Sequence, residues 1–326
     1  MNTPRDVLGL IVEPDPDHGG EQGGWRVIDG GGEVLGRGTL PRCDRLRLEH
    51  LRSGVGVGRP NMKFPTLGGK QLWGDVFVSC GWRIQQGVFN DHHRLLNPQD
   101  RRMAWGSFEE CRVAFEGERL ERGLRPQSAH ALVLLHGLIR AKEAMSALGA
   151  TFDKAGYEVL NVNYPSTRAG IEAHADQVER LLDQTWGIDT VSFVTHSLGG
   201  IVARTLLSRC GREGGWRERA RVHRLLMIFP PNQGASKAER WKSFALARAV
   251  WGPPLEELAP ESAPNIPIPP CHFAIIAGAR DRTVTLDEAA LPGADAFRVI
   301  DAEHTFGMKH PEVVEAALRY INGGDL

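Results

Sequence analysis

The chain has 326 residues, of which 41% are hydrophobic and 24% charged, and its mean hydropathy is -0.28. This composition is typical of a globular protein with ample core-forming capacity, and it excludes a disordered chain. The charges of 39 basic and 40 acidic side chains nearly cancel, so they give no electrostatic basis for binding nucleic acid or an anionic membrane.

The N-terminal residues show no targeting pattern. Residues 1–6 are polar, and the apolar run that follows, residues 7–12, is too short for a signal sequence or a membrane span. The cysteines are five, far apart and without a CxxC pair: Cys43, Cys80, Cys111, Cys210 and Cys271. An odd, scattered set predicts reduced thiols in a cytoplasmic protein, with a Cys80–Cys111 bridge as the open alternative.

The first 125 residues have a β-rich pattern. Residues 25–28 and 33–35 flank a glycine-rich turn, which predicts a β-hairpin. Further β-like runs are residues 71–78 and 82–85, and no long helical period is apparent before Pro126. We therefore predict a β-rich N-terminal extension over residues 1–125, with a junction near residues 125–128, and the sequence assigns it no role.

Two features of this extension resemble ligand sites only superficially. Asp91, His92 and His93 have no second cluster with metal-ligand spacing nearby, so we expect a polar loop there. The glycine-rich residues 54–58 lack the lysine and hydroxyl residue that end a phosphate-binding loop, which favours a turn or an edge strand. The sequence predicts neither a metal nor an organic cofactor.

The second part of the chain alternates apolar runs with polar turns. Residues 131–135 form a continuous apolar run of the buried-strand type, and His136, Gly137 and Leu138 follow it. A His-Gly turn after such a strand can direct a backbone N–H at a developing oxyanion, which makes Leu138 a candidate donor. His136 itself is expected to hold the turn together. The next strand, residues 157–160, leads into residues 161–166.

The most informative motif is Thr-His-Ser-Leu-Gly-Gly at residues 195–200. It follows the apolar run 191–194 and precedes a helix-like segment, residues 201–207. A strand, a sharp turn bearing serine and then a helix form a nucleophile elbow, in which small residues let the helix start close to the strand. The usual pattern is G-x-S-x-G, and Thr195 replaces its first glycine. The candidate nucleophile is Ser197, and the amide of Leu198 is the second oxyanion donor.

A cap is predicted after the following strand, residues 225–228. Residues 238–251 have a helix-compatible apolar pattern, and the prolines beyond them favour a stiff, extended return. We therefore expect a short cap around residues 236–264. Its apolar face either lines an acyl pocket or packs as an ordinary surface helix.

Candidate acid and base groups follow the last two predicted strands. Asp281 comes after the apolar run 272–277, and His304 comes after the run 296–300. Catalytic groups of open parallel sheets collect at the carboxyl ends of strands, and a base must face its nucleophile there. The less favoured alternatives are Asp301 and Asp287 for the acid and His310 for the base. We expect His196 to be packed and to point away from Ser197.

Residues from about 126 to 326 resemble the α/β-hydrolase superfamily and, within it, lipase-like serine esterases. The motifs that carry the resemblance are the elbow, the His136-Gly137 turn, residues 161–166 and residues 229–236, with Thr195 and an inserted Ala235 as departures. The resemblance implies a mostly parallel sheet flanked by helices, in a catalytic domain over residues 126–326.

The resemblance also implies the chemistry. Ser197 would attack a carboxylic ester, His304 would take its proton, and Asp281 would orient the imidazole, while the amides of Leu138 and Leu198 would bind the oxyanion. The partner would be a small-molecule or lipid ester, with no nucleic acid and no integral membrane segment involved. Alternatives are an amidase, a thioesterase or an acyltransferase with the same three residues, or a non-catalytic binding protein on this fold.

Overall fold

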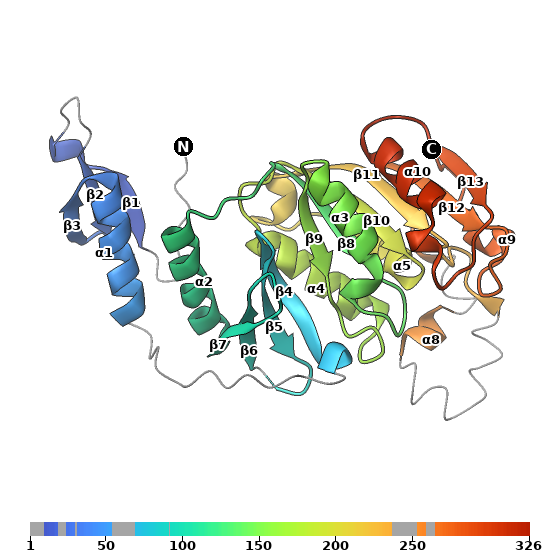
Figure 1. Cartoon of the computed structure of the whole chain (residues 1–326), viewed down its shortest axis with the longest axis horizontal. Coiled ribbons are helices and arrows are strands. Elements are labelled where there is room, and N and C mark those ends of the chain that lie inside the picture. Colours follow the sequence, from blue (N-terminus) through green and yellow to red (C-terminus); the bar gives the residue numbers. More distant parts are fainter. Residues whose placement is uncertain are drawn as a thin grey trace. The chain divides into compact units, whose positions relative to one another are not determined.

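The computed structural model describes residues 10–18, 24–29, 31–53, 69–90, 92–236, 253–258 and 265–326 (Figure 1). The chain divides into two compact units. One comprises residues 1–65, 82–86 and 91–125, and the other residues 66–81, 87–90 and 126–326. We keep the predicted division into residues 1–125 and 126–326 as a proposal.

The first unit begins with a three-stranded antiparallel sheet. Its strands are β1 (Ile11–Pro14), β2 (Trp25–Ile28) and β3 (Val34–Gly38), with β2 in the middle, and a short 3-10 helix, η1 (Pro16–His18), follows β1. The pairing of β2 with β3 confirms the hairpin predicted around the glycine-rich turn. Helix α1 (Leu40–Ser53) packs on β2 and β3.

Another group of antiparallel strands belongs to the same unit. Strands β5 (Trp82–Gly87), β6 (His93–Leu96) and β7 (Arg102–Gly106) pair in that order. Helix α2 (Phe108–Arg122) packs on β6 and β7. The antiparallel pairs confirm that the N-terminal part is rich in β-structure.

Helices α1 and α2 show that the expectation of no long helix before Pro126 is wrong. Helix α2 is marked by its caps: the Ser107 hydroxyl accepts from the Glu110 amide, and the Glu110 carboxylate accepts from the Ser107 amide. Gly123, in the left-handed conformation with φ of +63°, ends the helix. These capping residues were readable in the sequence, whereas the apolar stripe is interrupted by charged residues and does not give a clear helical period.

The second unit is built on six parallel strands in the order β13-β12-β11-β10-β8-β9. Their bounds are β8 (His130–Leu135), β9 (Glu158–Val162), β10 (Thr190–His196), β11 (Arg221–Ile228), β12 (His272–Gly278) and β13 (Ala296–Ile300). A further strand, β4 (Trp73–Ser79), follows a short helix, η2 (Gly69–Leu72). It lies beside the end of β9, where the Asp75 amide donates to the Asn163 carbonyl over 2.8 Å.

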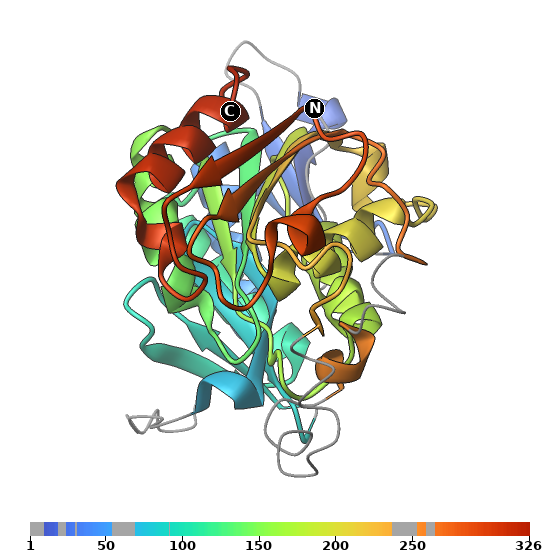
Figure 2. The same cartoon turned by 90° about the vertical axis from the view of Figure 1, so that its right-hand side faces the viewer.

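Helices cover both faces of this sheet (Figures 1 and 2). Helices α4 (Ile171–Gln184) and α5 (Leu198–Ser208) lie on one face, and α3 (Ser146–Lys154) and α10 (Pro311–Ile321) on the other. Because side chains alternate along a strand, Val133 packs toward α4 and α5 and Leu134 toward α3 and α10. The predicted parallel sheet flanked by helices is confirmed.

Short helices complete the second unit. They are η3 (Lys142–Met145), η4 (Trp216–Glu218), α8 (Pro254–Glu257), α9 (Leu286–Ala289) and η6 (Gly307–Lys309). None of the described helices combines the length and apolar character that a bilayer span requires. All five cysteines are free thiols.

The predicted cap lies mostly outside the described residues, because 237–252 and 259–264 are not among them. The described residues beside it are well anchored. The amide and hydroxyl of Ser236 donate to the Glu288 carboxylate over 2.7 and 2.5 Å. The buried Arg204 of α5 donates to the Asn232 side chain and to the Ile266 carbonyl, one on each side of the segment. The cap itself stays a prediction.

Of the two motifs singled out in the first unit, the structure describes only His92 and His93. Residues 54–58 lie outside the described residues, as does Asp91. The rings of His92 and His93 contact those of Trp105 and Phe108, with centroids 5.0 and 5.8 Å apart. In the described part of the chain, no three His, Cys, Asp or Glu side chains are grouped so that they could hold a metal ion.

Two buried histidines, His136 after β8 and His174 on α4, pack against Tyr164. The His136 ring stacks on Tyr164 with centroids 4.1 Å apart, and the His174 ring lies 4.9 Å from it on centroids. His136 Nδ1 donates to the Gly137 carbonyl over 2.9 Å, as befits a residue that holds the turn. Burial lowers the pKa of both imidazoles to about 4, so both are neutral at pH 7.

We expect the free energy of unfolding to fall between pH 7 and pH 5 by about 2 kcal/mol for each of these two imidazoles. An unfolded histidine has a pKa of about 6.5. Between that value and the folded value, the unfolded chain binds protons that the folded chain excludes, so stability is complete above the unfolded pKa and is lost as the pH falls. Urea unfolding at the two pH values measures this difference.

The variant that tests this expectation is His174→Gln. It should reduce the pH-dependent loss by about 2 kcal/mol, since glutamine does not titrate. An equal loss in His174→Gln and the wild type would contradict the assignment of a buried neutral ring.

Candidate active site

Ser197 occupies a strained turn between β10 and α5. Its φ of +52° and ψ of -122° are values that residues other than glycine rarely adopt. The Ser197 amide donates to the Ile228 carbonyl over 2.9 Å, which anchors the turn to β11. A Cβ on Gly199 would lie 2.5 Å from the Leu135 carbonyl oxygen, so only glycine lets α5 start this close to β8. These are the features of the predicted elbow.

Thr195, the departure from the usual elbow pattern, is accommodated by its neighbours. Its buried hydroxyl donates to the Leu226 carbonyl on β11 over 3.2 Å, which satisfies the polar group. Its hydroxyl oxygen would be 3.4 Å from a Cβ on Gly200, so the glycine leaves room beside it. The threonine therefore replaces glycine without leaving a buried hydroxyl unpaired.

His304 lies in the turn after β13 and joins Ser197 to Asp281. Its Nε2 is 2.9 Å from the Ser197 hydroxyl oxygen, and its Nδ1 is 2.7 Å from Oδ2 of Asp281. Because an ionised carboxylate only accepts, the Nδ1 proton faces Asp281 and the Nε2 lone pair faces the serine hydroxyl. In this tautomer His304 can take a proton from Ser197. The sequence-predicted acid, base and nucleophile thus lie in one hydrogen-bonded row.

Asp281 is held in place by the backbone that follows it. Its Oδ1 accepts from the amides of Thr283 and Val284 over 2.7 and 2.9 Å. The other carboxylate oxygen, Oδ2, then faces His304, and the Asp281 side chain is only 1% exposed. Both oxygens of this buried carboxylate therefore have hydrogen-bond partners.

The alternative candidates lie elsewhere. Asp301 accepts from Arg280 over 2.7 Å at the surface, and Asp287 lies in the first turn of α9. His310 precedes α10, and its backbone bonds to Gly307 and Val314. Among the contacts within the described ranges, none joins these three side chains to Ser197 or His304.

The predicted oxyanion turn lies directly against the elbow. A Cβ on Gly137 would be 3.2 Å from the Ser197 Cβ, so the absence of a side chain permits this approach. The Leu198 amide belongs to the first residue of α5, where no intrahelical acceptor exists. Within the described part of the chain, no group accepts a hydrogen bond from the Leu138 amide.

The four turns meet because of the strand order. The Leu138 turn follows β8, Ser197 follows β10, Asp281 follows β12 and His304 follows β13, all at the carboxyl edge of one parallel sheet. The sequence profile of the alpha/beta hydrolase family matches residues 132–317, more than half of the chain. The chain belongs to the alpha/beta hydrolase family. The matched region includes Ser197, Asp281 and His304.

Several solved structures of hydrolases are similar to this chain. The mature lipase BlEst2 of Bacillus licheniformis is 17% identical, with a TM-score of 0.47 over 60% of this chain and 94% of its own. The metagenomic carboxyl esterase MGS0156 is 18% identical, with a TM-score of 0.47 over 60% and 76%. A thermophilic esterase of Thermogutta terrifontis is 16% identical, with a TM-score of 0.41 over 59% and 89%. No curated protein matches the chain.

In this hydrolase-family chain, His196 contacts the backbone of His304, which the sequence did not predict. The ring is packed, as expected, but its Nε2 also donates to the His304 carbonyl over 2.9 Å. Burial lowers the pKa of His196 well below its usual value, so the ring is neutral and donates through one nitrogen only. His196 therefore holds the backbone of His304, from a position 108 residues away in sequence.

Phe229, just after β11, packs against both histidines, whose own ring centroids lie 5.1 Å apart. Its ring centroid lies 6.1 Å from those of His196 and His304. Gly307, three residues after His304, has no room for a Cβ because the Phe229 ring occupies that space. The turn that bears His304 therefore packs against the Phe229 ring and accepts a hydrogen bond from His196.

Proposed function

We propose that this alpha/beta hydrolase is a serine esterase that cleaves carboxylic esters through an acyl-Ser intermediate. The observation that carries the proposal is the hydrogen-bonded row from Ser197 through His304 to Asp281, with Ser197 on a strained elbow. A binding protein has no need of this row, because each of its contacts serves a proton transfer.

The first half of the reaction transfers the acyl group to the enzyme. Ser197 Oγ attacks the ester carbonyl carbon while His304 Nε2 takes the hydroxyl proton, and the Asp281 carboxylate stabilises the resulting imidazolium. The tetrahedral intermediate collapses as His304 returns the proton to the departing alkoxide, so an alcohol leaves. In the second half, water attacks the acyl-Ser with His304 as the base, and the acid is released. No step requires a metal or an organic cofactor.

The oxyanion donors of this proposal are the amides of Leu138 and Leu198. The closeness of Gly137 to Ser197 and the position of Leu198 at the first turn of α5 support them. Removing one such donor typically costs on the order of 10² to 10³ in kcat. Backbone donors are not removed by ordinary substitution, so their support is geometric.

The leaving group is the part of the proposal that needs a direct test. Turnover of 4-nitrophenyl butyrate is compared with that of the corresponding anilide and thioester, and a second alcohol is added to detect acyl transfer. We expect the ester to have the highest kcat/KM and the acid to be the main product. A faster anilide or thioester would make the chain an amidase or a thioesterase, and an alcohol-dependent ester product would make it an acyltransferase.

We also propose a cellular compartment and a substrate class for this esterase. The five free thiols support a cytoplasmic protein, because disulfides are rare in reducing compartments. The substrate would be a small-molecule or lipid ester, and neither nucleic acid nor an integral membrane segment takes part. Mass spectrometry of the thiols after alkylation in intact cells tests the compartment, with full labelling of exposed Cys210 expected.

His196 acts in this proposal as a positioning residue, and we expect His196→Phe to lower kcat about 10- to 100-fold with little change in KM. Phenylalanine keeps the packing but removes the donor to the His304 carbonyl, so the turn bearing the base can shift. His196→Gln retains a donor and should recover part of kcat. Steady-state kinetics of both variants measure this. Equal rates for His196→Phe and the wild type would show that the hydrogen bond from His196 does not position His304.

A further inference from the structure

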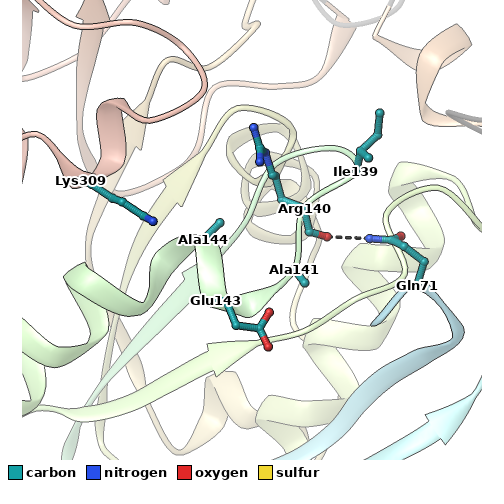
Figure 3. A pocket seen from close by; sticks show the side chains of 7 residues that line it. All are labelled: Gln71, Ile139, Arg140, Ala141, Glu143, Ala144 and Lys309. Carbon is teal, nitrogen blue, oxygen red and sulfur yellow. Dashed lines mark hydrogen bonds between the residues drawn. The ribbon is translucent and has the colours of Figure 1, made fainter. Parts of the chain in front are cut away.

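A pocket of about 330 Å³ opens beside the predicted oxyanion turn (Figure 3). Its wall includes Ile139, Arg140 and Glu143 from the segment after β8, Gln71 from η2, and Lys309 from the segment after β13. The volume suits a small group of a larger ligand, since whole-ligand sites begin near this size.

Two of the segments that line the pocket also bear groups of the proposed active site. Arg140 follows Leu138 by two residues, and Lys309 follows His304 by five. The two segments meet where the Arg140 guanidinium lies over the Phe306 ring, 5.8 Å from its centroid. The pocket is therefore lined by the same two segments that bear the Leu138 amide and His304.

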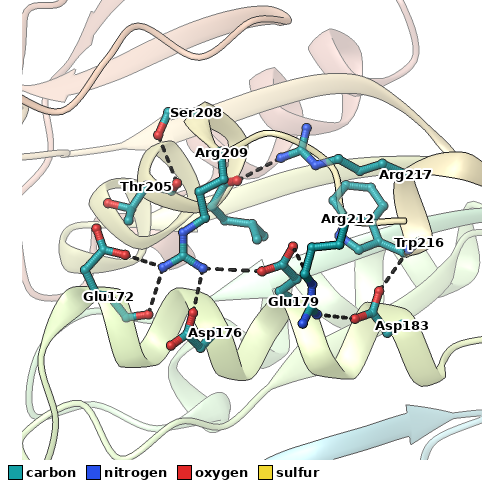
Figure 4. A network of polar contacts seen from close by, with 11 residues as sticks. Glu172, Asp176, Glu179, Asp183, Thr205, Ser208, Arg209, Arg212, Trp216 and Arg217 are labelled. Carbon is teal, nitrogen blue, oxygen red and sulfur yellow. Dashed lines mark hydrogen bonds and ion pairs between the residues drawn. The ribbon is translucent and has the colours of Figure 1, made fainter. Parts of the chain in front are cut away.

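The two cations of this pocket, Arg140 and Lys309, take part in no ion pair within the described part of the chain. Arg209, by contrast, contacts three carboxylates of α4 (Figure 4). Arg140 and Lys309 are not engaged in such ion pairs, so their charges are available to a ligand.

Glu143 is the one acidic side chain of the pocket wall. Its carboxylate and the Arg140 guanidinium point in opposite directions, and the Lys309 amino group reaches in from the side (Figure 3). Glu143 also lies 4.0 Å from the Lys142 amino group, outside the pocket wall. The pocket wall therefore carries two positive charges, those of Arg140 and Lys309, against the single negative charge of Glu143.

The segment that bears Arg140 is preorganised. Gln71 donates to the Arg140 carbonyl over 2.6 Å, and the Ile139 amide donates to the Ser166 hydroxyl over 3.0 Å. The Gln71 side-chain oxygen in turn accepts from the Thr167 amide over 3.2 Å. Because the backbone is held on both sides, the guanidinium can bind a ligand without first ordering its loop.

Ile139 adds an apolar contact at the rim of the pocket. Its φ is +62°, a left-handed conformation that a β-branched residue adopts only at a cost in free energy, and its side chain is 49% exposed. Glycine would adopt this turn without strain. A strained isoleucine that leaves about half of its surface exposed at the pocket offers that surface to a bound molecule.

We propose that this pocket binds a carboxylate of the substrate, so that the preferred substrates are esters that carry a negative charge. Arg140 provides a bidentate donor and Lys309 a point charge, while Ile139 contacts the apolar part of the same molecule. The inference rests on the proposed esterase function and adds the chemical class of its substrate. The carboxylate belongs either to the acyl chain or to the alcohol.

Two pairs of esters distinguish these sources. The acyl-side pair is the 4-nitrophenyl monoester of glutarate against 4-nitrophenyl pentanoate, and the alcohol-side pair is 4-carboxyphenyl pentanoate against phenyl pentanoate. For each pair, the ratio of kcat/KM for the charged ester to that for the neutral ester is measured. We expect Arg140→Gln and Lys309→Gln each to lower this ratio about tenfold in one of the two pairs.

Matched variants separate local from general electrostatics. Lys154→Gln removes the same charge from an exposed position at the end of α3 and should leave both ratios unchanged. Glu143→Gln removes the acidic side chain and should raise the ratio. Added salt should lower the wild-type ratio, because screening weakens partly exposed charge pairs.

Binding of glutarate, followed by calorimetry, gives a readout that does not need turnover. We expect the double variant Arg140→Gln/Lys309→Gln to bind glutarate at least tenfold more weakly than the wild type. Ratios that are equal in the wild type, Arg140→Gln and Lys309→Gln for both pairs would overturn the proposal, as would equal glutarate binding in the double variant. Failure of the esterase proposal looks different: no ester is hydrolysed by any variant, while the glutarate result still decides whether the pocket binds a carboxylate.

Discussion

Ser197→Ala should lower kcat for ester hydrolysis by on the order of 10⁶-fold, the loss found when the nucleophile of a serine protease is removed. The hydroxyl is the group that faces His304 Nε2, over 2.9 Å, and alanine leaves no nucleophile in its place. The thermal midpoint should change little, because alanine keeps the Cβ and the same backbone requirement at φ of +52°. Steady-state kinetics and thermal unfolding measure the two quantities.

The matched control is Ser208→Ala at the end of α5, which removes a hydroxyl bonded to the Thr205 carbonyl and should leave kcat unchanged. A fluorophosphonate probe adds a direct chemical readout, since it labels an activated serine. The probe should label the wild type and Ser208→Ala but not Ser197→Ala. Labelling of Ser197→Ala at the wild-type level, or near-normal turnover, would remove Ser197 from the mechanism.

Asp281→Asn should lower kcat about 10⁴-fold, as the equivalent change does in a serine protease. The physical reason is specific to this turn. The amides of Thr283 and Val284 must be met by an acceptor, so the asparagine oxygen takes the place of Oδ1. Its NH₂ group then faces His304 Nδ1 and donates to it, which puts the ring proton on Nε2. In that tautomer His304 cannot accept the proton of Ser197.

The control for Asp281→Asn is Asp301→Asn. Asp301 follows β13 and is 76% exposed in its side chain, where it pairs with Arg280. Surface pairs contribute little, so both kcat and stability should stay near the wild-type values. A severe loss in Asp301→Asn together with a nearly silent Asp281→Asn would mean that the acid has been assigned to the wrong carboxylate.

The missed helices show where sequence patterns are weak. Apolar periodicity found the strands of the parallel sheet because both of its faces are buried, which gives continuous apolar runs. In helix α2, charged residues interrupt the buried apolar face, so the apolar periodicity of its sequence is weak. Its two ends were nevertheless marked by the capping residues Ser107, Glu110 and Gly123. For this helix the capping chemistry was the better signal.

The sequence by itself determined which residues follow the strands. Ser197, Asp281 and His304 were each predicted at the carboxyl end of an apolar run, because local patterns encode where a strand stops. The choice of Asp281 over Asp301 was not local, since both follow strands. The tertiary structure supports the proposed assignment of Asp281: its carboxylate accepts from His304 Nδ1 over 2.7 Å, while that of Asp301 accepts from Arg280 at the surface.

Only the tertiary structure brought together groups that are far apart in the chain. His196 and the His304 carbonyl are 108 residues apart, and the pocket draws Gln71, Arg140 and Lys309 from three separate segments. Such contacts depend on strand order and on how turns pack against each other, and neither leaves a periodic trace in the sequence. Local patterns set the positions of side chains along each strand, whereas the order β13-β12-β11-β10-β8-β9 set which of them meet.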